Sequence, residues 1–364
     1  LFYMFITPFQ GEYLRQQQDV APNFRQASKA ELEPMMEQKY EYIPSELEQY
    51  FIDNLDNLGY NETNNPLTCN VWTDPKVTNP SIHAKLQAYI QSIENHTRAI
   101  NRFEPIPDIL KTIQETNSYD VCTTTRLEGE RVDNFFSDLA LSNTGMSGFV
   151  EPLLPPMRHH GICSDFRKNL MNMNYLVHDF EAMCHNLKPT SRRVLIDMGA
   201  SLSFHGGQAQ PIIWLIKLFE KFGFYFDHIY GFEITFTEPE KVYRELLPEE
   251  YMASYHWINV GIEHNEDSKL NPLKSILQKF NEDDLIIVKL DIDTPFIELP
   301  LTQQLLENKD GVYGKLIDQF YFEHHVHLGE LKNNWRSQVN GTIKDSLELF
   351  HELRKEGIPA HFWP

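Results

Sequence analysis

Hydrophobic residues follow a regular alternation in the second half of the chain, from residue 193 onward. Short apolar runs, typical of buried strands, alternate there with segments in which apolar residues recur at helical spacing. The predicted strands cover residues 194–196, 228–232, 256–260, 285–290, 317–322 and 358–363. The predicted helices cover residues 211–222, 239–247, 273–280, 301–308 and 344–355. Alternation of this kind predicts an α/β fold, with right-handed crossovers and a doubly wound, mostly parallel sheet covered by helices on both faces.

The first half of the chain instead predicts helices joined by long loops. Capping signals and helical spacing predict helices over residues 45–52, 82–103 and 169–187. Residues 151–160 contain three prolines, and proline interrupts both helices and strands, so we expect an irregular segment there. The chain is therefore expected to comprise a helical, loop-rich N-terminal region, residues 1–189, that packs on an α/β domain, residues 190–364.

The composition is that of a globular protein with a large core. The chain has 364 residues, of which 24 are Phe, 16 Tyr and 5 Trp, and aromatic side chains bury large areas. This content excludes a disordered chain, and no apolar run approaches the roughly 20 residues that span a bilayer. The 52 acidic residues exceed the 32 lysines and arginines, which gives a net charge of −20. A strongly acidic protein repels nucleic-acid phosphates and anionic lipid, so we expect neither as a partner.

Several features favour the secretory pathway. Residues 1–6 form an apolar stub without an initiator methionine, which we interpret either as a packing arm or as the cut end of a signal peptide or membrane anchor. Asn61, Asn95 and Asn340 begin N-x-T sequons, the acceptor sites for N-glycosylation. The favoured compartment is the lumen of the endoplasmic reticulum or Golgi, with an N-terminal membrane anchor outside this chain. The alternative is a cytoplasmic protein.

Four cysteines are present, and an even number permits two disulfides in an oxidising compartment. They lie at Cys69, Cys122, Cys163 and Cys184, and none forms the C-x-x-C motif of zinc ribbons and thioredoxins. Because Cys163 and Cys184 flank the same predicted helical segment, we expect them to pair, which leaves Cys69 with Cys122. In the cytoplasmic alternative, all four are reduced and mostly buried thiols.

Residues suited to ligand binding stand where the predicted strands end, which is where ligands bind in open α/β sheets. The first strand is followed by Asp197-Met198-Gly199-Ala200-Ser201, in which the glycine permits a tight turn and a close ligand approach. The second ends at Glu233, whose carboxylate suits the two hydroxyls of a ribose. The remaining candidates follow the fourth and fifth strands and are Asp291, Asp293, Glu323, His324, His325 and His327.

Together these segments resemble class I S-adenosylmethionine-dependent methyltransferases, and in particular the FkbM-like group, whose members often methylate sugar hydroxyls. Residues 194–203 resemble the family's D-x-G-A-N-x-G loop, and residues 230–233 its F-E pair at the second strand. Residues 289–293 resemble its K-I-D-V-E-G segment, and residues 322–324 its E-x-H or E-H strand end. The resemblance covers about residues 190–330, under half of the chain.

The resemblance implies a Rossmann-like fold, S-adenosylmethionine as cofactor, and methyl transfer to a hydroxyl of a carbohydrate or small molecule. It implies a cofactor site formed by Asp197, Gly199, Ala200, Ser201, Glu233 and Asp291. We predict His324 as the proton acceptor, Glu323 as the group that orients it, and Asp291 as the residue that places the cofactor or the acceptor hydroxyl. His325 and His327 share one strand face, but their spacing sets no third ligand, so no metal site is predicted.

Three departures from the family pattern leave the function open. Ser201 and Ser203 replace the family's asparagine and last glycine, and Asp293-Thr294 replaces its E-G. A Cβ atom at Ser203 crowds the methionine moiety, so the alternative is a non-catalytic lumenal or extracellular binding or assembly protein that retains the fold. An enzyme that uses another nucleotide is a further alternative, although the absence of G-x-G-x-x-G opposes NAD.

Two further expectations concern what surrounds the site. The sequence leaves no room for the family's seventh strand, so we expect the sheet to be incomplete or completed by N-terminal sequence. Arg158-His159-His160, within the proline-rich segment, is interpreted either as a lid over the acceptor site or as a packed surface loop.

Overall fold

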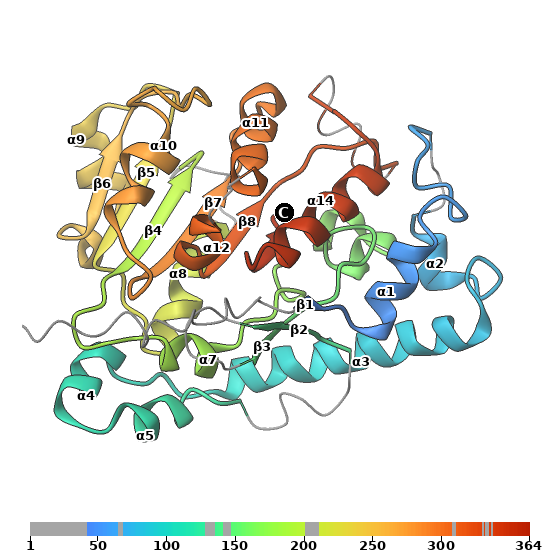
Figure 1. Cartoon of the computed structure of the whole chain (residues 1–364), viewed down its shortest axis with the longest axis horizontal. Coiled ribbons are helices and arrows are strands. Elements are labelled where there is room, and N and C mark those ends of the chain that lie inside the picture. Colours follow the sequence, from blue (N-terminus) through green and yellow to red (C-terminus); the bar gives the residue numbers. More distant parts are fainter. Residues whose placement is uncertain are drawn as a thin grey trace, which may run out of the picture. The chain divides into compact units, whose positions relative to one another are not determined.

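Six parallel strands form the central sheet (Figure 1). In sheet order they are β6 (Tyr255–Ile258), β5 (His228–Phe232), β4 (Arg193–Met198), β7 (Leu285–Leu290), β8 (Gln319–Phe322) and β9 (Ala360–Phe362). Every neighbouring pair is parallel. This order is that of a doubly wound sheet whose direction of winding reverses between β4 and β7. The predicted α/β class with a mostly parallel sheet is confirmed, and the arrangement is consistent with a Rossmann-like fold.

The structure is a computed structural model, which describes residues 42–64, 68–127, 135–140, 147–200, 211–307, 311–329, 331, 335 and 338–364. These residues all lie within one compact unit, residues 40–364. In this described part of the chain, no helix has both the length and the apolar character needed to cross a membrane.

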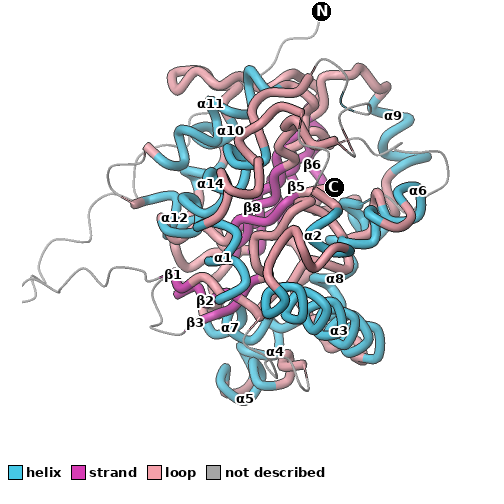
Figure 2. The backbone as a smooth tube through the Cα atoms, turned by 90° about the vertical axis from the view of Figure 1, so that its right-hand side faces the viewer, coloured by secondary structure: helices cyan, strands magenta, loops and turns pink. Residues whose placement is uncertain are grey.

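Helices cover both faces of the sheet, with α11, α12 and α14 on one side of the strands and α8 on the other (Figure 2). Their bounds, with those of two shorter helices, are α8 (Pro211–Lys221), α9 (Pro239–Lys241), α10 (Pro272–Ser275), α11 (Pro295–Leu306), α12 (Val312–Leu316) and α14 (Ile343–Lys355). A π-helical turn, Val242–Leu246, continues α9, and a 3₁₀ turn, Leu277–Lys279, follows α10. The predicted helix 301–308 begins earlier, because Pro295 is preorganised for a first helical turn. The helix α12 was not predicted from the sequence.

The two central strands, β4 and β7, are buried along their full length because helices cover both faces. Most of their residues are aliphatic, as in Leu285-Ile286-Ile287-Val288. Each strand nevertheless carries a charged residue next to its carboxyl end, Asp197 on β4 and Lys289 on β7, and both are buried. Buried charges are costly unless they are paired, so these two residues draw attention to this end of the sheet.

The segments before residue 190 are helical and loop-rich, and they also contain a small antiparallel sheet. Its strands are β1 (Tyr42–Ile43), β2 (Ser137–Ala140) and β3 (Ser147–Val150). The longer helices are α1 (Glu46–Asp53), α3 (Pro80–Arg102), α4 (Ile109–Glu115), α5 (Ser118–Thr123) and α7 (Phe180–His185). The described residues also form two four-residue helices, α2 (Asn70–Thr73) and α6 (Phe166–Asn169), and a 3₁₀ turn, His160–Cys163. The small sheet escaped prediction because its strands are too short to show an alternating pattern.

The predicted helices 45–52 and 82–103 are confirmed as α1 and α3. Of the segment 151–160 that was expected to be irregular, residues 151–159 contain neither helix nor strand, and His160 begins a 3₁₀ turn. The prediction of one helix over residues 169–187 is wrong. In place of a continuous helix, the side chain of Asn169 accepts from Asn172, and that of Asn172 accepts from the amide of Asn174 at 3.0 Å. Such local bonds compete with a helix, and Asp179 then caps α7 by accepting from the amide of Ala182 at 2.9 Å.

Two disulfides are present, but the predicted pairing is wrong. Cys69 pairs with Cys163, and Cys122 pairs with Cys184, with Cα–Cα distances of 5.2 and 5.3 Å. The reason is tertiary, because α5 packs against α7 and so brings Cys122 to Cys184. Cys163 and Cys184, which flank residues 164–183, are thus each held by a different part of the chain.

A buried polar network joins the segments before residue 190 to the last helix and strand. Arg354 on α14 has no exposed surface, and its guanidinium lies 3.3 Å from Glu48 Oε2 and 3.4 Å from Glu151 Oε1. Glu151 also lies 2.8 Å from Nδ1 of His361 on β9. One charged side chain near the end of the chain therefore contacts acids from α1 and from the proline-rich segment.

Candidate functional site

A cavity of about 780 Å³ lies beyond the carboxyl ends of the strands at the centre of the sheet. Gly199 follows β4, Glu233 follows β5 and Asp291 follows β7, and all three line the cavity. This is the point at which the winding of the sheet reverses, where open α/β sheets bind their ligands. Its volume lies within the range of sites for small molecules and cofactors.

One wall of the cavity is a loop that carries Glu233. The side chain of Asn259, just after β6, donates to the carbonyls of Glu233 at 2.6 Å and Thr235 at 2.9 Å. It also accepts from the amide of Thr237 at 2.9 Å, so a single side chain holds the loop against the next strand. Glu233 Oε1 accepts from the amide of Thr235 at 2.6 Å. This fixes the carboxylate at the cavity, where an acid is suited to binding hydroxyl groups.

The rest of this wall is apolar. Phe232, Trp257, Val260 and Ile262 line it. Ile234, in the same loop as Glu233, also lines the cavity and has 78% of its surface exposed. An apolar surface next to a carboxylate is suited to a ligand that combines an aromatic ring with hydroxyl groups, as a nucleoside does.

Lys289 links the carboxyl ends of β4 and β7 beneath the cavity. Its ammonium nitrogen lies 3.1 Å from Asp197 Oδ1 and 3.3 Å from Asp291 Oδ2, and it donates to the carbonyl of Gly199 at 2.9 Å. Burial disfavours the charged ammonium, but the two carboxylates outweigh this effect and raise the pKa of Lys289. Burial raises the pKa of Asp197 despite the neighbouring Lys289. The lysine therefore holds the two strand ends together and engages the carboxylate of Asp197 in an ion pair.

Gly199 is required by the backbone around it. Its φ is +95°, and a Cβ atom at this position would lie 1.6 Å from the carbonyl oxygen of Asp291. No side chain fits there, because the contact is with backbone and cannot move aside. The glycine after β4 thus serves the close packing of two strand ends and, with it, the floor of the cavity.

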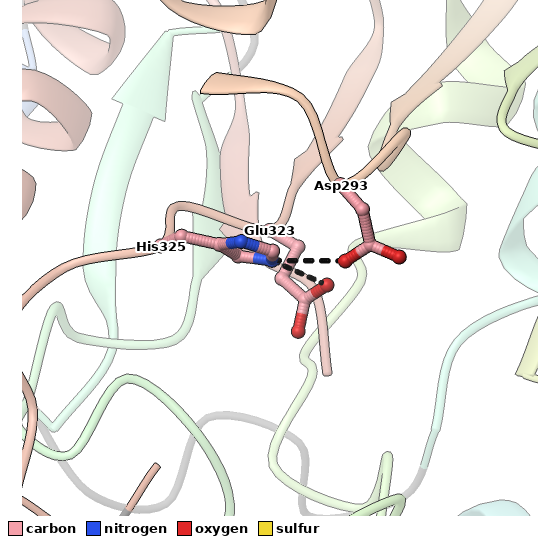
Figure 3. A group of neighbouring side chains, drawn as sticks. All are labelled: Asp293, Glu323 and His325. Atoms are coloured by element: carbon pink, nitrogen blue, oxygen red, sulfur yellow. Dashed lines mark hydrogen bonds and ion pairs between the residues drawn. The ribbon is translucent and has the colours of Figure 1, made fainter. Parts of the chain in front are cut away.

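A second group of polar side chains lies at the ends of β7 and β8 (Figure 3). His325 Nε2 lies 3.0 Å from Glu323 Oε2 and 3.5 Å from Asp293 Oδ1. The His325 ring has no exposed surface and stacks on Trp335, with 4.8 Å between the ring centroids. Asp293 is 60% exposed and lines the cavity, so it connects this triad of Asp293, Glu323 and His325 with the cavity.

Arg158 orients the triad from the proline-rich segment. Its guanidinium is ion-paired with Glu323 Oε1, which also accepts from Trp335 Nε1 at 3.1 Å. Burial opposes the charge of Glu323, but Arg158 and His325 outweigh burial and hold the pKa of Glu323 well below its ordinary value. Burial lowers the pKa of His325, yet the bond to Glu323 dominates and raises it. Arg158 therefore packs beneath the site and is not a surface residue.

Glu298, on the first turn of α11, shapes the loop between β7 and that helix. Its buried carboxylate accepts from the amides of Ile292 at 2.8 Å and Thr294 at 3.2 Å, the two neighbours of Asp293. Burial raises its pKa to about 7. The sequence carries no signal for this role, because the acid lies in a helix and binds backbone.

The predicted cofactor residues fall into three groups. Gly199, Glu233 and Asp291 line the cavity. Asp197 instead lies under it, bound to Lys289, and Ala200 is buried. Ser201 and Ser203, with His205, lie outside the described residues.

The predicted catalytic residues are also separated. His324 is buried away from the cavity lining and stacks on Phe322, with 5.3 Å between ring centroids. Burial lowers the pKa of His324 to about 4. Glu323 bonds to His325 rather than to His324. His327 uses its backbone amide, which donates to the carbonyl of Gly341 at 3.0 Å.

The asparagines of all three sequons, Asn61, Asn95 and Asn340, are exposed, and Asn340 also lines the cavity. The amide of Asn340 donates to the carbonyl of His325 at 2.8 Å. The segment that carries this sequon is therefore anchored to the triad.

Comparison of the chain with family models, with curated proteins and with solved structures gives no match. What the site does is therefore inferred from its own residues and geometry.

Proposed function

We propose that this protein is an S-adenosylmethionine-dependent methyltransferase that modifies a hydroxyl group of a carbohydrate or small molecule. The observation that carries the proposal is Glu233, held beside an apolar wall in a cavity at the switch point of a doubly wound sheet. An adenine ring suits the apolar wall, and the two ribose hydroxyls suit the carboxylate. The sequence resemblance to FkbM-like methyltransferases supports the same cofactor.

The charge at this end of the sheet supports a cationic ligand. Asp291 and Asp293 line the cavity beside Glu233, and the charge of Lys289 is shared between Asp197 and Asp291. An excess of carboxylates attracts a positive group, and the sulfonium of S-adenosylmethionine is one. A nicotinamide dinucleotide, with its negative pyrophosphate, is disfavoured by the same charges.

In methyl transfer the acceptor oxygen bonds to the methyl carbon as the carbon–sulfur bond breaks. The neutral thioether S-adenosylhomocysteine leaves, and the hydroxyl proton passes to a base. The protein's part is to bring oxygen and carbon into line and to accept the proton. We propose that the acceptor hydroxyl binds at the triad of Asp293, Glu323 and His325, because Asp293 lines the cavity and His324 does not.

A location in the secretory pathway belongs to the same proposal. Two disulfides are characteristic of proteins that fold in an oxidising compartment. Exposed Asn61 and Asn95 are available as glycosylation sites.

Calorimetric titration of the protein with S-adenosylmethionine tests the proposal. We expect one site per chain, and Glu233→Ala should weaken binding by about 1.5–3 kcal/mol, the contribution of hydrogen bonds to a charged group. Glu282→Ala, at an exposed position before β7 and outside the cavity lining, is the matched control and should bind as the wild type does. Absence of binding to the wild type, or unchanged affinity in Glu233→Ala, would overturn the assignment and favour a non-catalytic binding or assembly protein.

A further inference from the structure

The triad of Asp293, Glu323 and His325 has the composition of a metal site. It offers two carboxylate oxygens and one imidazole nitrogen, and these three atoms lie within 4.8 Å of one another. They come from two loops, since Asp293 follows β7 while Glu323 and His325 follow β8 (Figure 3). The parallel pairing of β7 with β8 brings the loops together, so the sheet itself builds the arrangement.

The distances match neighbouring ligands of one ion. A divalent first-row cation lies about 2.1 Å from each ligand atom, so atoms at right angles about the ion are about 3.0 Å apart. His325 Nε2 lies 3.0 Å from Glu323 Oε2 and 3.5 Å from Asp293 Oδ1. An ion can therefore enter with small side-chain movements.

The surroundings orient two of the three ligands. Glu323 Oε1 is occupied by Arg158 and Trp335, which leaves Oε2 directed at His325. The His325 ring is fully buried against Trp335, and its Nε2 is the nitrogen that faces the carboxylates. Partners that fix the direction of metal ligands in this way are typical of metal sites.

The acidic groups at this end of the sheet outnumber the basic groups. Among the described residues at this end of the sheet, six carboxyl groups face two permanent positive charges. The carboxyl groups are those of Asp197, Glu233, Asp291, Asp293, Glu298 and Glu323, and the positive groups are Lys289 and Arg158. Lys289 pairs with Asp197 and Asp291, and Arg158 pairs with Glu323. Asp293 lines the cavity, and its Oδ1 lies 3.5 Å from Nε2 of His325.

We infer that Asp293, Glu323 and His325 bind a divalent first-row cation at the edge of the cavity. One imidazole with two carboxylates favours Mn²⁺, Fe²⁺ or Zn²⁺ over Mg²⁺, which prefers oxygen ligands and retains its water. Three protein ligands leave coordination positions open toward the cavity. In the proposed methyltransferase the ion would polarise the acceptor hydroxyl and make its proton more acidic, so that the proton would pass to water as the methyl group is transferred. Metal binding itself does not rest on that function.

Titration of the full chain with Mn²⁺ tests the inference. Binding is measured by electron paramagnetic resonance, as the loss of the signal of the free ion. We expect one Mn²⁺ per chain, and Mg²⁺ should compete weakly. Asp293→Asn and His325→Gln should each weaken binding at least about 10-fold, since even partners of metal ligands contribute 10–100-fold. Asp267→Asn, at a side chain that is 96% exposed in another acidic part of the surface, is the matched control and should not change the affinity.

The result that overturns the inference is the absence of Mn²⁺ binding at millimolar concentration, or binding that survives in both triad variants. Circular dichroism and thermal unfolding show whether each variant is folded, and the exposed Asp293 provides a variant unaffected by core packing. Titration with S-adenosylmethionine, measured separately, distinguishes the two proposals. Mn²⁺ binding with no cofactor binding rejects only the methyltransferase, and the reverse rejects only the metal site.

Discussion

Lys289 on β7 lies 3.1 Å from Asp197 on β4, and both side chains are almost fully buried. The acid that the sequence pattern presents as a ligand for the cofactor is thus already paired within the protein. The pair joins two neighbouring strands at the point where the cavity begins.

Removing the lysine alone should destabilise the fold strongly. In Lys289→Met, Asp197 is left buried without its counter-charge, so we expect the free energy of unfolding to fall by about 3–5 kcal/mol. Urea denaturation measures this loss. The double variant Asp197→Leu with Lys289→Met should recover part of it, because Asp197 no longer remains as a buried unpaired charge, whereas Asp291 still lacks its partner. Lys217→Met is the control, because its ion pairs are half-exposed and contribute at most about 1 kcal/mol.

Asp318, just before β8, should make stability depend on pH. It accepts from the amide of Ile286 at 2.7 Å, and burial raises its pKa to about 7 from an ordinary 3.8. The pKa of Asp318 is higher in the folded state than in the unfolded state. The contribution of Asp318 to the free energy of unfolding is therefore fully present below about pH 4 and is lost as pH rises through 7. Asp318→Asn should therefore match the wild type at pH 4 and exceed its stability at pH 8 by about 2–4 kcal/mol, at about 1.4 kcal/mol per pKa unit. Denaturant unfolding at several pH values checks this, and a constant difference between the two proteins would contradict it.

His324 should have the opposite dependence. Burial lowers its pKa to about 4 from 6.5, so its contribution to stability is present above pH 6.5 and is lost as pH falls toward 4. Neither ring nitrogen has a hydrogen-bond partner among the described residues, and the ring stacks on Phe322. His324→Phe should keep the stacking, and it should gain about 1–2 kcal/mol over the wild type at pH 5. Thermal unfolding at pH 5 and pH 8 measures the difference. In a methyltransfer assay this variant should retain turnover, and a loss of 100-fold or more would restore His324 as the base.

The disulfide pairing should be visible by mass spectrometry. Digestion without reduction should yield a peptide pair that contains Cys122 and Cys184, and another that contains Cys69 and Cys163. Replacing Cys122 and Cys184 together by alanine removes a crosslink across 62 residues, which should lower the free energy of unfolding by about 3–4 kcal/mol. Peptides that join Cys163 to Cys184 would instead support the pairing expected from the sequence.

The sequence predicted the central sheet well because its strands are buried on both faces. Leu285-Ile286-Ile287-Val288 has the uninterrupted apolar character of such a strand. The strand ends then locate the cavity, and Gly199, Glu233 and Asp291 line it as expected. The small sheet of β1, β2 and β3 carries no such signal, since four-residue strands with mixed polarity resemble loops.

The polar triad was harder to predict because it lies beyond the end of β8. The chain is not a strand after Phe322, so the alternation of faces that relates His325 to His327 in a strand does not apply. Arg158, which precedes Glu323 by 165 residues, turns the carboxylate toward His325. A contact of that separation leaves no local pattern in the sequence, and the same reason explains the wrong disulfide pairing.

The network around Arg354 also sets the order in which the protein can mature during synthesis. Glu48 leaves the ribosome 306 residues ahead of Arg354, and Glu151 leaves 203 residues ahead of it. Until α14 emerges, both acids lack the guanidinium that neutralises them, and burying them without it is costly. Burial of these acids is therefore expected to be completed only when the last helix is available. Folding of the protein then depends on a late step, the packing of α14. In a chain that is truncated before Arg354, Glu48 and Glu151 lack their buried counter-charge.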